Sequence, residues 1–294
     1  VLKLKFRLGL FEEEVISEKH TPIRTANAVK LARKAAEQSI TLLKNDGVLP
    51  LDIQKCQSIA LIGPNADIAQ VGDYCEGIRQ KHLVSPLAGL TAKIGKEKIL
   101  YSMGCGISMR NDDLLSDAVA KAKAADIVVL ALGDNVGSGI REVGGVGGGG
   151  SVSVKNPTTN SEGFDVSSLV LPDSQRELFD VVAATGKPII TVLYTGYQRV
   201  IVNEYQKSSA FLQAWYPGEQ GGNALADILF GDVNPSGKLA VSLPQSDGHI
   251  PCYYNHRVSG RGSLYRRPGS LENPGRDYVF SSPDAFLSFG YGLS

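Results

Sequence analysis

The stretch Asp126 to Gly133, DIVVLALG, is the most hydrophobic run of the chain and decides its fold class. Its apolar residues are continuous rather than alternating with polar ones, which is typical of a β-strand covered on both faces. The preceding residues, Asp112 to Ala125, place Leu115, Ala118 and Ala122 on one face at helical spacing. A helix followed by a doubly covered strand indicates an α/β fold with a mainly parallel sheet between helices.

The alternation of helix and strand continues on both sides of this stretch. One further helix is predicted over Thr25 to Leu43, ending near Asn45, and another over Gly221 to Phe230. A third is predicted to begin at Ser174, with Glu177 at capping-box spacing, and to stop at Gly186. The other predicted strands are Ser58 to Gly63, Lys98 to Met103, Pro188 to Tyr194, Ala210 to Trp215 and Lys238 to Leu243. Six strands are therefore expected.

The composition limits the classes of partner. The 294 residues are 43% hydrophobic and 20% charged, which is typical of a globular protein, and the formal net charge is zero. Without long blocks of like charge we expect neither nucleic acid nor a membrane surface as a partner. The four cysteines (Cys56, Cys75, Cys105, Cys252) are widely spaced, so we expect buried thiols, with one disulfide as the alternative. The four histidines are also far apart, so we expect no metal site.

A long unpatterned region, Asp134 to Gly163, follows the apolar strand. Ligands of parallel sheets bind at the carboxyl ends of the strands, and long loops in compact domains are usually functional or mobile. Gly145, Gly147 and Gly150 match the G-x-G-x-x-G spacing of dinucleotide-binding loops. However, no strand is predicted directly before these glycines and no helix directly after them, so the pattern does not favour a dinucleotide site.

Four separated motifs resemble one known family. They are ARKAAEQSITLLKNDGVLPL at Ala32 to Leu51, IGPNAD at Ile62 to Asp67, WYPGEQGGNALADILFGDVNPSGKLAVSLP at Trp215 to Pro244 and FGYGLS at Phe289 to Ser294. In this order they resemble the second domain of glycoside hydrolase family 3, the β-glucosidase and β-xylosidase family. The resemblance implies a six-stranded α/β sandwich that contributes an acid/base Glu on a loop. It also implies a separate (β/α)8-type barrel domain that carries an Asp nucleophile.

The resemblance suggests a division of the chain into three parts. Residues 1–24 are expected to be the end of a preceding barrel domain and a linker, because VLKLKFRLGLF at Val1 to Phe11 resembles the end of the barrel. Residues 25–244 are expected to form the α/β sandwich. Residues 245–294, rich in Gly, Pro, Tyr and Arg, are expected to wrap around it as loops.

Glu162 matches the acid/base of the family by its place after the Gly-rich loop and before LVLPDSQ at Leu169 to Gln175. One departure is that many members have Asp-Arg shortly after the Glu, whereas here Asp165 is followed by Val166. Glu142, in IREVGG, is the rival candidate, and a purely solvated role for either glutamate is the remaining alternative.

Four further residues are candidates for substrate binding. Asp73 and Tyr74 follow the loop of the first strand, Trp215 ends a predicted strand, and His256 lies among tyrosines and arginines in the terminal region. Aromatic side chains can stack on sugar rings, which would give these residues a role in substrate binding. The alternative is that they only pack within surface loops. For Trp215 the sequence leaves open whether it faces the cleft or caps the sheet.

The sequence therefore predicts the second domain of a retaining, exo-acting β-glycosidase. Its substrate would be a β-linked gluco- or xylo-oligosaccharide, no metal or organic cofactor would be needed, and a barrel domain in cis or in trans would supply the nucleophile. Without that barrel we expect no turnover. The alternative is a catalytically inactive, stand-alone module that binds a sugar or a partner. A homo-oligomer is left open, and the substrate class suggests a periplasmic or secreted location.

Overall fold

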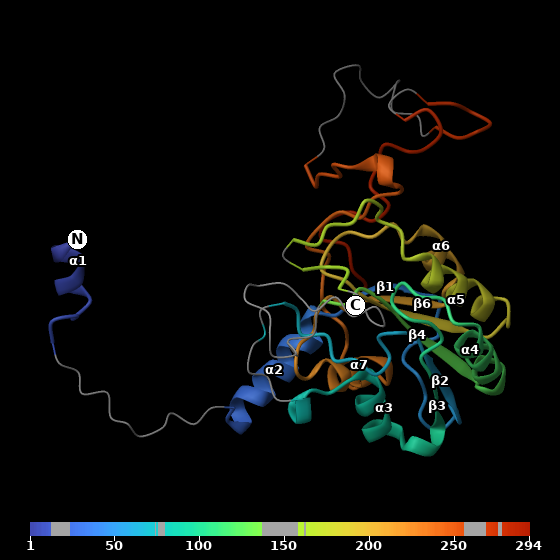
Figure 1. Cartoon of the computed structure of the whole chain (residues 1–294), viewed down its shortest axis with the longest axis horizontal. Helices are drawn as coiled ribbons and strands as arrows, with labels where there is room; N and C mark the ends of the chain where they lie inside the picture. Colours follow the sequence, from blue (N-terminus) through green and yellow to red (C-terminus); the bar gives the residue numbers. More distant parts are fainter. Residues whose placement is uncertain are drawn as a thin grey trace.

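The computed structural model describes residues 1–12, 24–73, 75, 80–136, 158–161, 163–255, 269–275 and 278–294. These residues form a six-stranded sheet between two layers of helices (Figure 1). The strands are β1 (Thr41–Asn45), β2 (Ile59–Ile62), β3 (Ile99–Ser102), β4 (Ile127–Gly133), β5 (Ile189–Tyr194) and β6 (Ala210–Gln213). The predicted fold class, a mainly parallel six-stranded sheet sandwiched between helices, is confirmed.

The strand order is β1-β6-β5-β4-β2-β3, and all neighbours are parallel except β1, which runs antiparallel to β6. All seven residues of β4 are buried, as expected for a strand covered on both faces. The register of β4 and β5 ends with Gly133 opposite Tyr194. Because the two strands end at the same level, the residues that follow them begin side by side at one edge of the sheet.

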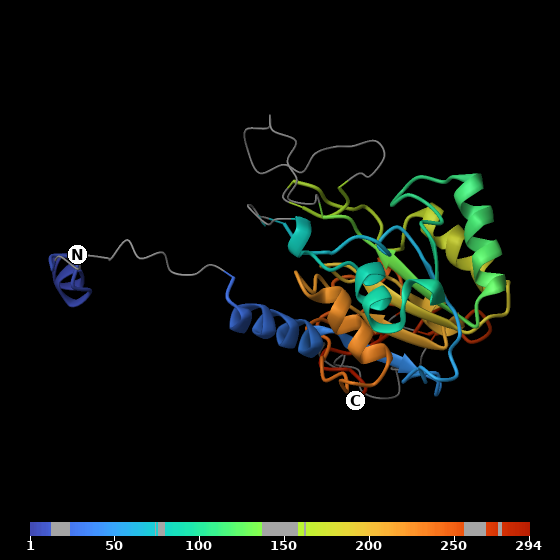
Figure 2. The same cartoon turned by 90° about the horizontal axis from the view of Figure 1, so that it is seen from below.

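Two helical layers cover the sheet. One contains α2 (Ala26–Ser39), α3 (Pro86–Ile94) and α7 (Gly221–Leu229), and the other contains α4 (Asp112–Ala124), α5 (Asp173–Ala183) and α6 (Val202–Lys207). Figure 2 shows α2 running into the layer that α3 and α7 form. The remaining helices are α1 (Leu2–Arg7) and the short 3-10 helices η1 (Gln80–His82), η2 (Lys96–Lys98) and η3 (Asp247–His249).

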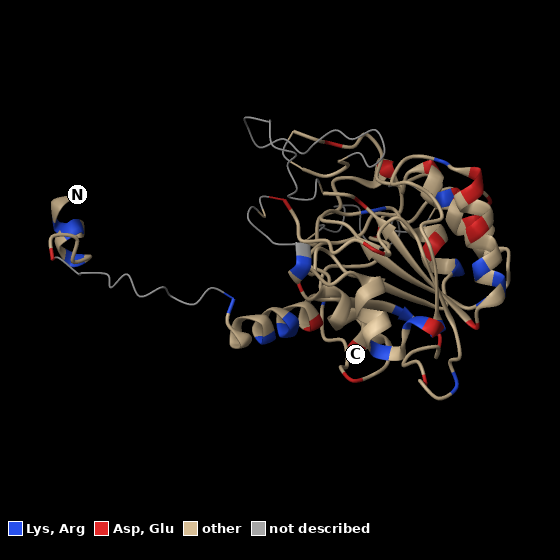
Figure 3. Ribbon diagram, turned by 60° about the horizontal axis from the view of Figure 1, so that its bottom comes forward, with Lys and Arg blue, Asp and Glu red and all other residues tan. Residues whose placement is uncertain are grey.

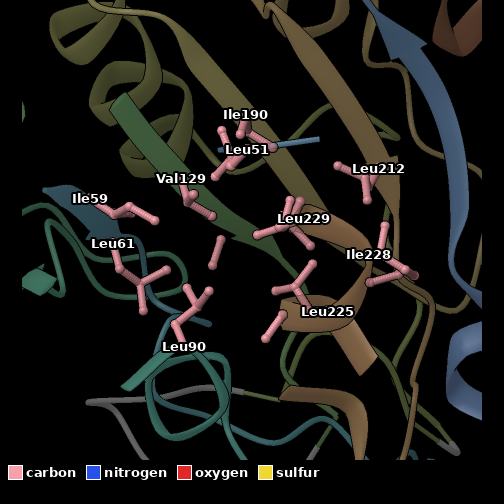
Figure 4. Packing of buried hydrophobic residues seen from close by; sticks show 14 of the residues in the cluster. Leu51, Ile59, Leu61, Leu90, Val129, Ile190, Leu212, Leu225, Ile228 and Leu229 are labelled. Atoms are coloured by element: carbon pink, nitrogen blue, oxygen red, sulfur yellow. The ribbon is translucent and has the colours of Figure 1, made fainter. Parts of the chain in front are cut away.

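Alternate residues of the strands enter two separate cores. On the α3 and α7 side, apolar side chains of the sheet meet those of both helices (Figure 4). The residues involved include Ile59, Leu61, Val129, Ile190 and Leu212 from the strands and Leu90, Leu225, Ile228 and Leu229 from the helices. On the other side, Val128, Leu130 and Phe211 pack with residues of α4 and α5 such as Ala118 and Phe179.

Two glycines allow α3 and α7 to pack closely. A Cβ at Gly89 would lie 2.1 Å from the carbonyl oxygen of Gly222, and a Cβ at Gly222 would lie 2.0 Å from that of Ser85. The segment before α3 also bonds to the segment before α7, because Val84 N–H donates to the Glu219 carbonyl at 2.9 Å. The connections after β2 and after β6 are therefore held against each other.

The prediction was wrong for two elements of the sheet. The helix expected over Thr25 to Leu43 ends at Ser39, and the next residues form the edge strand β1. Ile40 already has extended backbone angles, and the buried Leu42 and Leu43 pack on opposite faces of the sheet, as residues of a strand do. The stretch Lys238 to Leu243 is not a strand of the sheet, since only Leu243 forms an isolated bridge, with Leu287.

Smaller corrections concern the helices. The capping box at Ser174 does not form, because α5 begins at Asp173 and the Ser174 hydroxyl donates to the Gly106 carbonyl at 3.3 Å. The helices α3 and α6 were not predicted from the sequence. The other predicted helices and strands are present, with ends that differ by a few residues.

The described part of residues 245–294 contains η3 and otherwise turns and irregular segments that pack on the sandwich. Leu293 N–H donates to the Leu42 carbonyl at 2.8 Å, and Leu239 N–H donates to the Tyr291 carbonyl at 2.8 Å. Basic and acidic residues both occur along α2, α4 and α5 (Figure 3). Among the described residues, no helix is both long and apolar enough to cross a membrane.

Candidate active site

The candidate site lies at the carboxyl edge of the sheet, where the long region after β4 leaves the strand and returns. Its two described ends are bonded to each other: Thr159 N–H donates to the Asn135 carbonyl at 2.9 Å, and Asn135 N–H donates to Thr159 Oγ1 at 3.0 Å. The returning chain therefore lies against the end of β4.

A glycine is required where β4 ends. Gly133 has a φ of +129°, and a Cβ there would lie 1.9 Å from the carbonyl oxygen of Tyr194 on β5. This close approach lets Asp134 N–H donate to the same carbonyl at 2.7 Å. Asp134 is thereby fixed as the first residue beyond the two central strands.

Asp134 is the centre of a buried polar network. Its side chain is fully buried, and its Oδ1 accepts hydrogen bonds from Thr159 Oγ1 at 2.9 Å and from Tyr197 OH at 3.2 Å. The guanidinium of Arg199, which is 2% exposed, pairs with the same carboxylate through Nη2 and reaches Oδ2 through Nε at 3.4 Å. Arg199 Nη1 also donates to the Val170 carbonyl at 2.6 Å. The network thus joins the chain after β4, the chain after β5 and both sides of position 162.

Two buried tyrosines border this network. Burial raises the pKa of Tyr197, and the charge of Asp134 raises it further. The pKa of Tyr216 is also raised, mainly by burial and then by Asp134. Both phenols therefore stay protonated at neutral pH and act as neutral hydrogen-bonding groups.

Three consecutive residues, Thr159 to Ser161, are each held by a different part of the sheet edge. Thr159 bonds to Asp134 after β4, and Asn160 Nδ2 donates to Tyr216 OH, after β6, at 2.8 Å. The Ser161 hydroxyl donates to the carboxylate of Asp73, in the connection after β2. The segment that leads into position 162 is therefore anchored by three connections.

The residues on either side of position 162 are also bonded to each other. Phe164 N–H donates to the Ser161 carbonyl at 3.1 Å, and Gly163 has a left-handed φ of +78°. Glycine adopts this conformation without the steric cost that other residues have. Ser161 and Phe164, which flank this position, are therefore held close to each other.

Of the six site residues predicted from sequence, the structure describes two. Asp73 contacts Ser161 and so belongs to the same cluster. Trp215 directly precedes Tyr216, has a φ of +57°, and packs, half-buried, against the core on the α4 and α5 side. The other four, Glu162, Glu142, Tyr74 and His256, lie outside the described residues.

The buried network itself was not predicted from the sequence. Asp134 and Arg199 are far apart in the sequence, and only the parallel pairing of β4 with β5 brings them together. A signal was available, because polar residues that directly follow the two most apolar strands meet at one edge of a parallel sheet.

Two buried polar atoms of this part of the chain have no hydrogen-bond partner in the structure, Asn65 Nδ2 and Thr158 Oγ1. Asn65 Oδ1 accepts a hydrogen bond from Gln70 Nε2 at 2.5 Å, and the same Nε2 donates to the Asp134 carbonyl at 3.1 Å. Within the described ranges, no group of three or more His, Cys, Asp or Glu side chains is arranged to hold a metal ion.

The C-terminal region borders the segment after position 162. The Asp247 carboxylate accepts hydrogen bonds from Ser168 Oγ and from Leu169 N–H, both at 2.7 Å. A small pocket of about 260 Å³ is lined by His249 and the exposed Tyr253 and Tyr254, among other residues. These three aromatic residues precede His256 in the chain and share this pocket.

Comparison with known proteins gives a consistent result. Residues 40–294 match the family model of the glycosyl hydrolase family 3 C-terminal domain. The chain is 32% identical to a periplasmic beta-glucosidase of Salmonella typhimurium and 33% identical to a beta-xylosidase of Formosa agariphila. All of the chain is covered in both cases, but it spans only 39% and 38% of these relatives.

Solved structures agree with this result. The chain resembles a mutant of the beta-glucosidase from Listeria innocua in complex with laminaribiose, with a TM-score of 0.78 and 31% identity. All of the chain and 37% of that protein are covered. Another structure of the beta-glucosidase from the same organism matches with a TM-score of 0.77.

Proposed function

Since the chain belongs to glycosyl hydrolase family 3, as the C-terminal domain of that family, we propose that it is the second domain of a retaining, exo-acting β-glycosidase. In this proposal Glu162 is the acid/base, and an Asp of a barrel domain outside these residues is the nucleophile. The observation that carries the proposal is the anchoring of Thr159, Asn160 and Ser161, directly before Glu162, to three connections of the sheet edge.

The chemistry needs two carboxyl groups on opposite sides of the scissile bond, about 5 to 5.5 Å apart. The nucleophile attacks the anomeric carbon while the bond to the leaving oxygen breaks, and protonated Glu162 donates its proton to that oxygen. In the second step, ionised Glu162 takes a proton from water, and the water oxygen displaces the nucleophile from the anomeric carbon. The β-configuration is retained, and both carboxyl groups return to their starting states.

The substrate class in this proposal is a β-linked gluco- or xylo-oligosaccharide, because the relatives are named beta-glucosidase and beta-xylosidase. The Salmonella relative is a periplasmic enzyme by name, and we extend a location outside the cytoplasm to this protein. The loop anchored at Asp134 would deliver its acid to a sugar bound mainly by the barrel.

The test uses a polypeptide in which this chain follows a family 3 barrel domain. We expect hydrolysis of p-nitrophenyl β-glucoside or β-xyloside, with the β-anomer as the first product by NMR. Glu162→Gln should lower kcat/KM for phenyl β-glucoside, whose leaving group needs the acid, by about 10²- to 10⁴-fold, because a positioned acid is lost. Glu142→Gln is the matched control and should keep most of the activity.

Two results would contradict the proposal. Wild-type rates from Glu162→Gln, together with loss of activity in Glu142→Gln, would move the acid/base role to the rival glutamate. Sugar binding without any turnover in the joined polypeptide would instead support the catalytically inactive binding module.

A further inference from the structure

We propose that the buried pair of Asp134 and Arg199, acting through the Thr159 hydroxyl, is a positioning device that sets where the acid/base at position 162 meets the leaving oxygen. This inference rests on the proposed function. It assigns a role in the reaction to buried residues that act through another group.

The ion pair of Asp134 and Arg199 is buried. Among the ion pairs of the described residues, this is the one in which both side chains are almost fully buried, at 0% and 2% exposure. A buried ion pair gives little net stability compared with well-packed apolar side chains, because both ions lose their hydration. Its value at this place is therefore the fixed geometry that it imposes.

The carboxylate of Asp134 is shared by three hydrogen-bond donors. Its Oδ1 accepts hydrogen bonds from Thr159, Tyr197 and Arg199 together, so moving any one of them disturbs the others. Tyr197 and Arg199 both follow β5, and Arg199 stacks over the Tyr197 ring at 4.8 Å. Tyr197 and Arg199, which follow β5, therefore hold the Asp134 carboxylate in place. The remaining donor that the carboxylate can orient is Thr159, on the segment before position 162.

Thr159 is the member of the network on the loop side. Its hydroxyl donates to Asp134 and accepts from Asn135 N–H, so the side chain is held in both of its hydrogen-bonding roles. It lies three residues before Glu162, in the stretch that Asn160 and Ser161 continue. A displacement of about 1 Å of a catalytic group can cost about 10²-fold in rate.

The decisive variant is Thr159→Val in the same joined polypeptide, because it removes the hydroxyl and keeps the shape of the side chain and the Asp134–Arg199 pair. We expect kcat/KM for phenyl β-glucoside, whose leaving group needs the acid, to fall by about 10- to 100-fold. The value for 2,4-dinitrophenyl β-glucoside, whose leaving group needs no proton, should change by less than about threefold. Thr159→Ser should restore both values.

The matched control is Thr185→Val. Thr185 is also a half-buried threonine whose hydroxyl makes a hydrogen bond, to the Val182 carbonyl at 2.7 Å at the end of α5, away from the sheet edge. The Thr185→Val variant should hydrolyse both substrates with wild-type kcat/KM. Asp134→Asn is a second probe and should also lower kcat/KM for phenyl β-glucoside selectively. If Asp134→Asn does not fold, the result for Thr159→Val decides.

The outcomes separate this inference from the proposed function. If Glu162→Gln loses the phenyl substrate selectively and Thr159→Val does not, the inference is wrong and the proposed function stands. Equal loss on both substrates in Thr159→Val would show a merely structural role and would also overturn the inference. If Glu162→Gln itself shows no dependence on the leaving group, the proposed function fails, and the inference fails with it.

Discussion

Gly133 shows how one residue connects the core to the site. It ends the most apolar strand, and its backbone lies so close to β5 that the carbonyl oxygen of Tyr194 occupies the space of a Cβ, at 1.9 Å. The next residue is Asp134, the acceptor at the centre of the network. Because Gly133 has no Cβ, β4 stays paired with β5 up to its last residue. The buried carboxylate of Asp134 can then follow directly after the paired strands.

We expect Gly133→Ala to lower the free energy of unfolding by about 3 kcal/mol or more, because the new methyl group meets backbone and adds left-handed strain. Gly186→Ala is the control, since Gly186 also has a positive φ, of +73°, but a Cβ there would have nothing within 4 Å. It should cost only about 1 to 2 kcal/mol. Urea unfolding of both variants measures the difference, and equal losses would show that the close approach to Tyr194 is unimportant.

At the scale of elements, α6 is a short helix held by contacts from several sides. Lys44 of β1 donates to the carbonyls of Tyr205, Gln206 and Ser208, at 3.3, 3.1 and 2.6 Å. Cations at a helix C-terminus are favourable because the last carbonyls lack partners within the helix. Glu204 lies on the same helix and is buried, with 3% of its surface exposed.

The burial of Glu204 predicts a dependence of stability on pH. Burial raises the pKa of this carboxyl above its ordinary value of 4.5, so the folded protein keeps the proton to a higher pH than the unfolded chain does. The resulting stabilisation is complete below pH 4.5 and is lost as the pH rises through the folded-state pKa. Wild type should therefore lose stability relative to Glu204→Gln as the pH rises from about 4.5 through the folded-state pKa of Glu204.

Thermal unfolding at several pH values measures this difference. The exposed Glu272→Gln is the control and should follow wild type at every pH. A Glu204→Gln variant that parallels wild type over the whole range would contradict the argument.

The elements also show why some of the fold could be predicted from sequence and some could not. The central strands β2, β4 and β5 are bounded, apolar runs, and local sequence is enough to identify them. The edge strand β1 was hidden because Ile40 and Leu43 also continue the helical spacing of α2. Pairing with β6, which lies far along the chain, makes this segment a strand.

The same limit applies to the candidate site. Asp73 was a candidate because it follows the loop of the first central strand, and it contacts Ser161 in the segment before Glu162. Its role in substrate binding stays a prediction. Arg199 could not, because nothing near it in the sequence indicates that its partner is Asp134. Tyr216 was missed for the same reason, since its partner Asn160 lies on another connection.

At the scale of the whole molecule, the two cores and the two ends of the chain play different roles. Tyr291 and Leu293 are half-buried and pack against the two cores on opposite faces of the sheet. In contrast, no residue of α1 is buried, and the large apolar side chains of the first twelve residues are each more than half exposed. They are Val1, Leu2, Leu4, Phe6, Leu8, Leu10 and Phe11. That residues 1–24 belong to a preceding domain and linker stays a prediction, which truncation can test.

Removing residues 1–12 should therefore leave Tm unchanged within about 1 °C, because these residues bury no side chain in either core. It should also reduce ANS fluorescence, because seven exposed apolar side chains are lost together. Removing Phe289 to Ser294 is the matched truncation at the other end and should lower Tm by about 5 to 10 °C, since the bonds of Leu293 to Leu42 and of Tyr291 to Leu239 disappear with their packing. Calorimetry of the two truncated chains measures both effects. A marked fall in Tm on removal of residues 1–12 would mean that α1 belongs to the sandwich and that the proposed domain boundary is wrong.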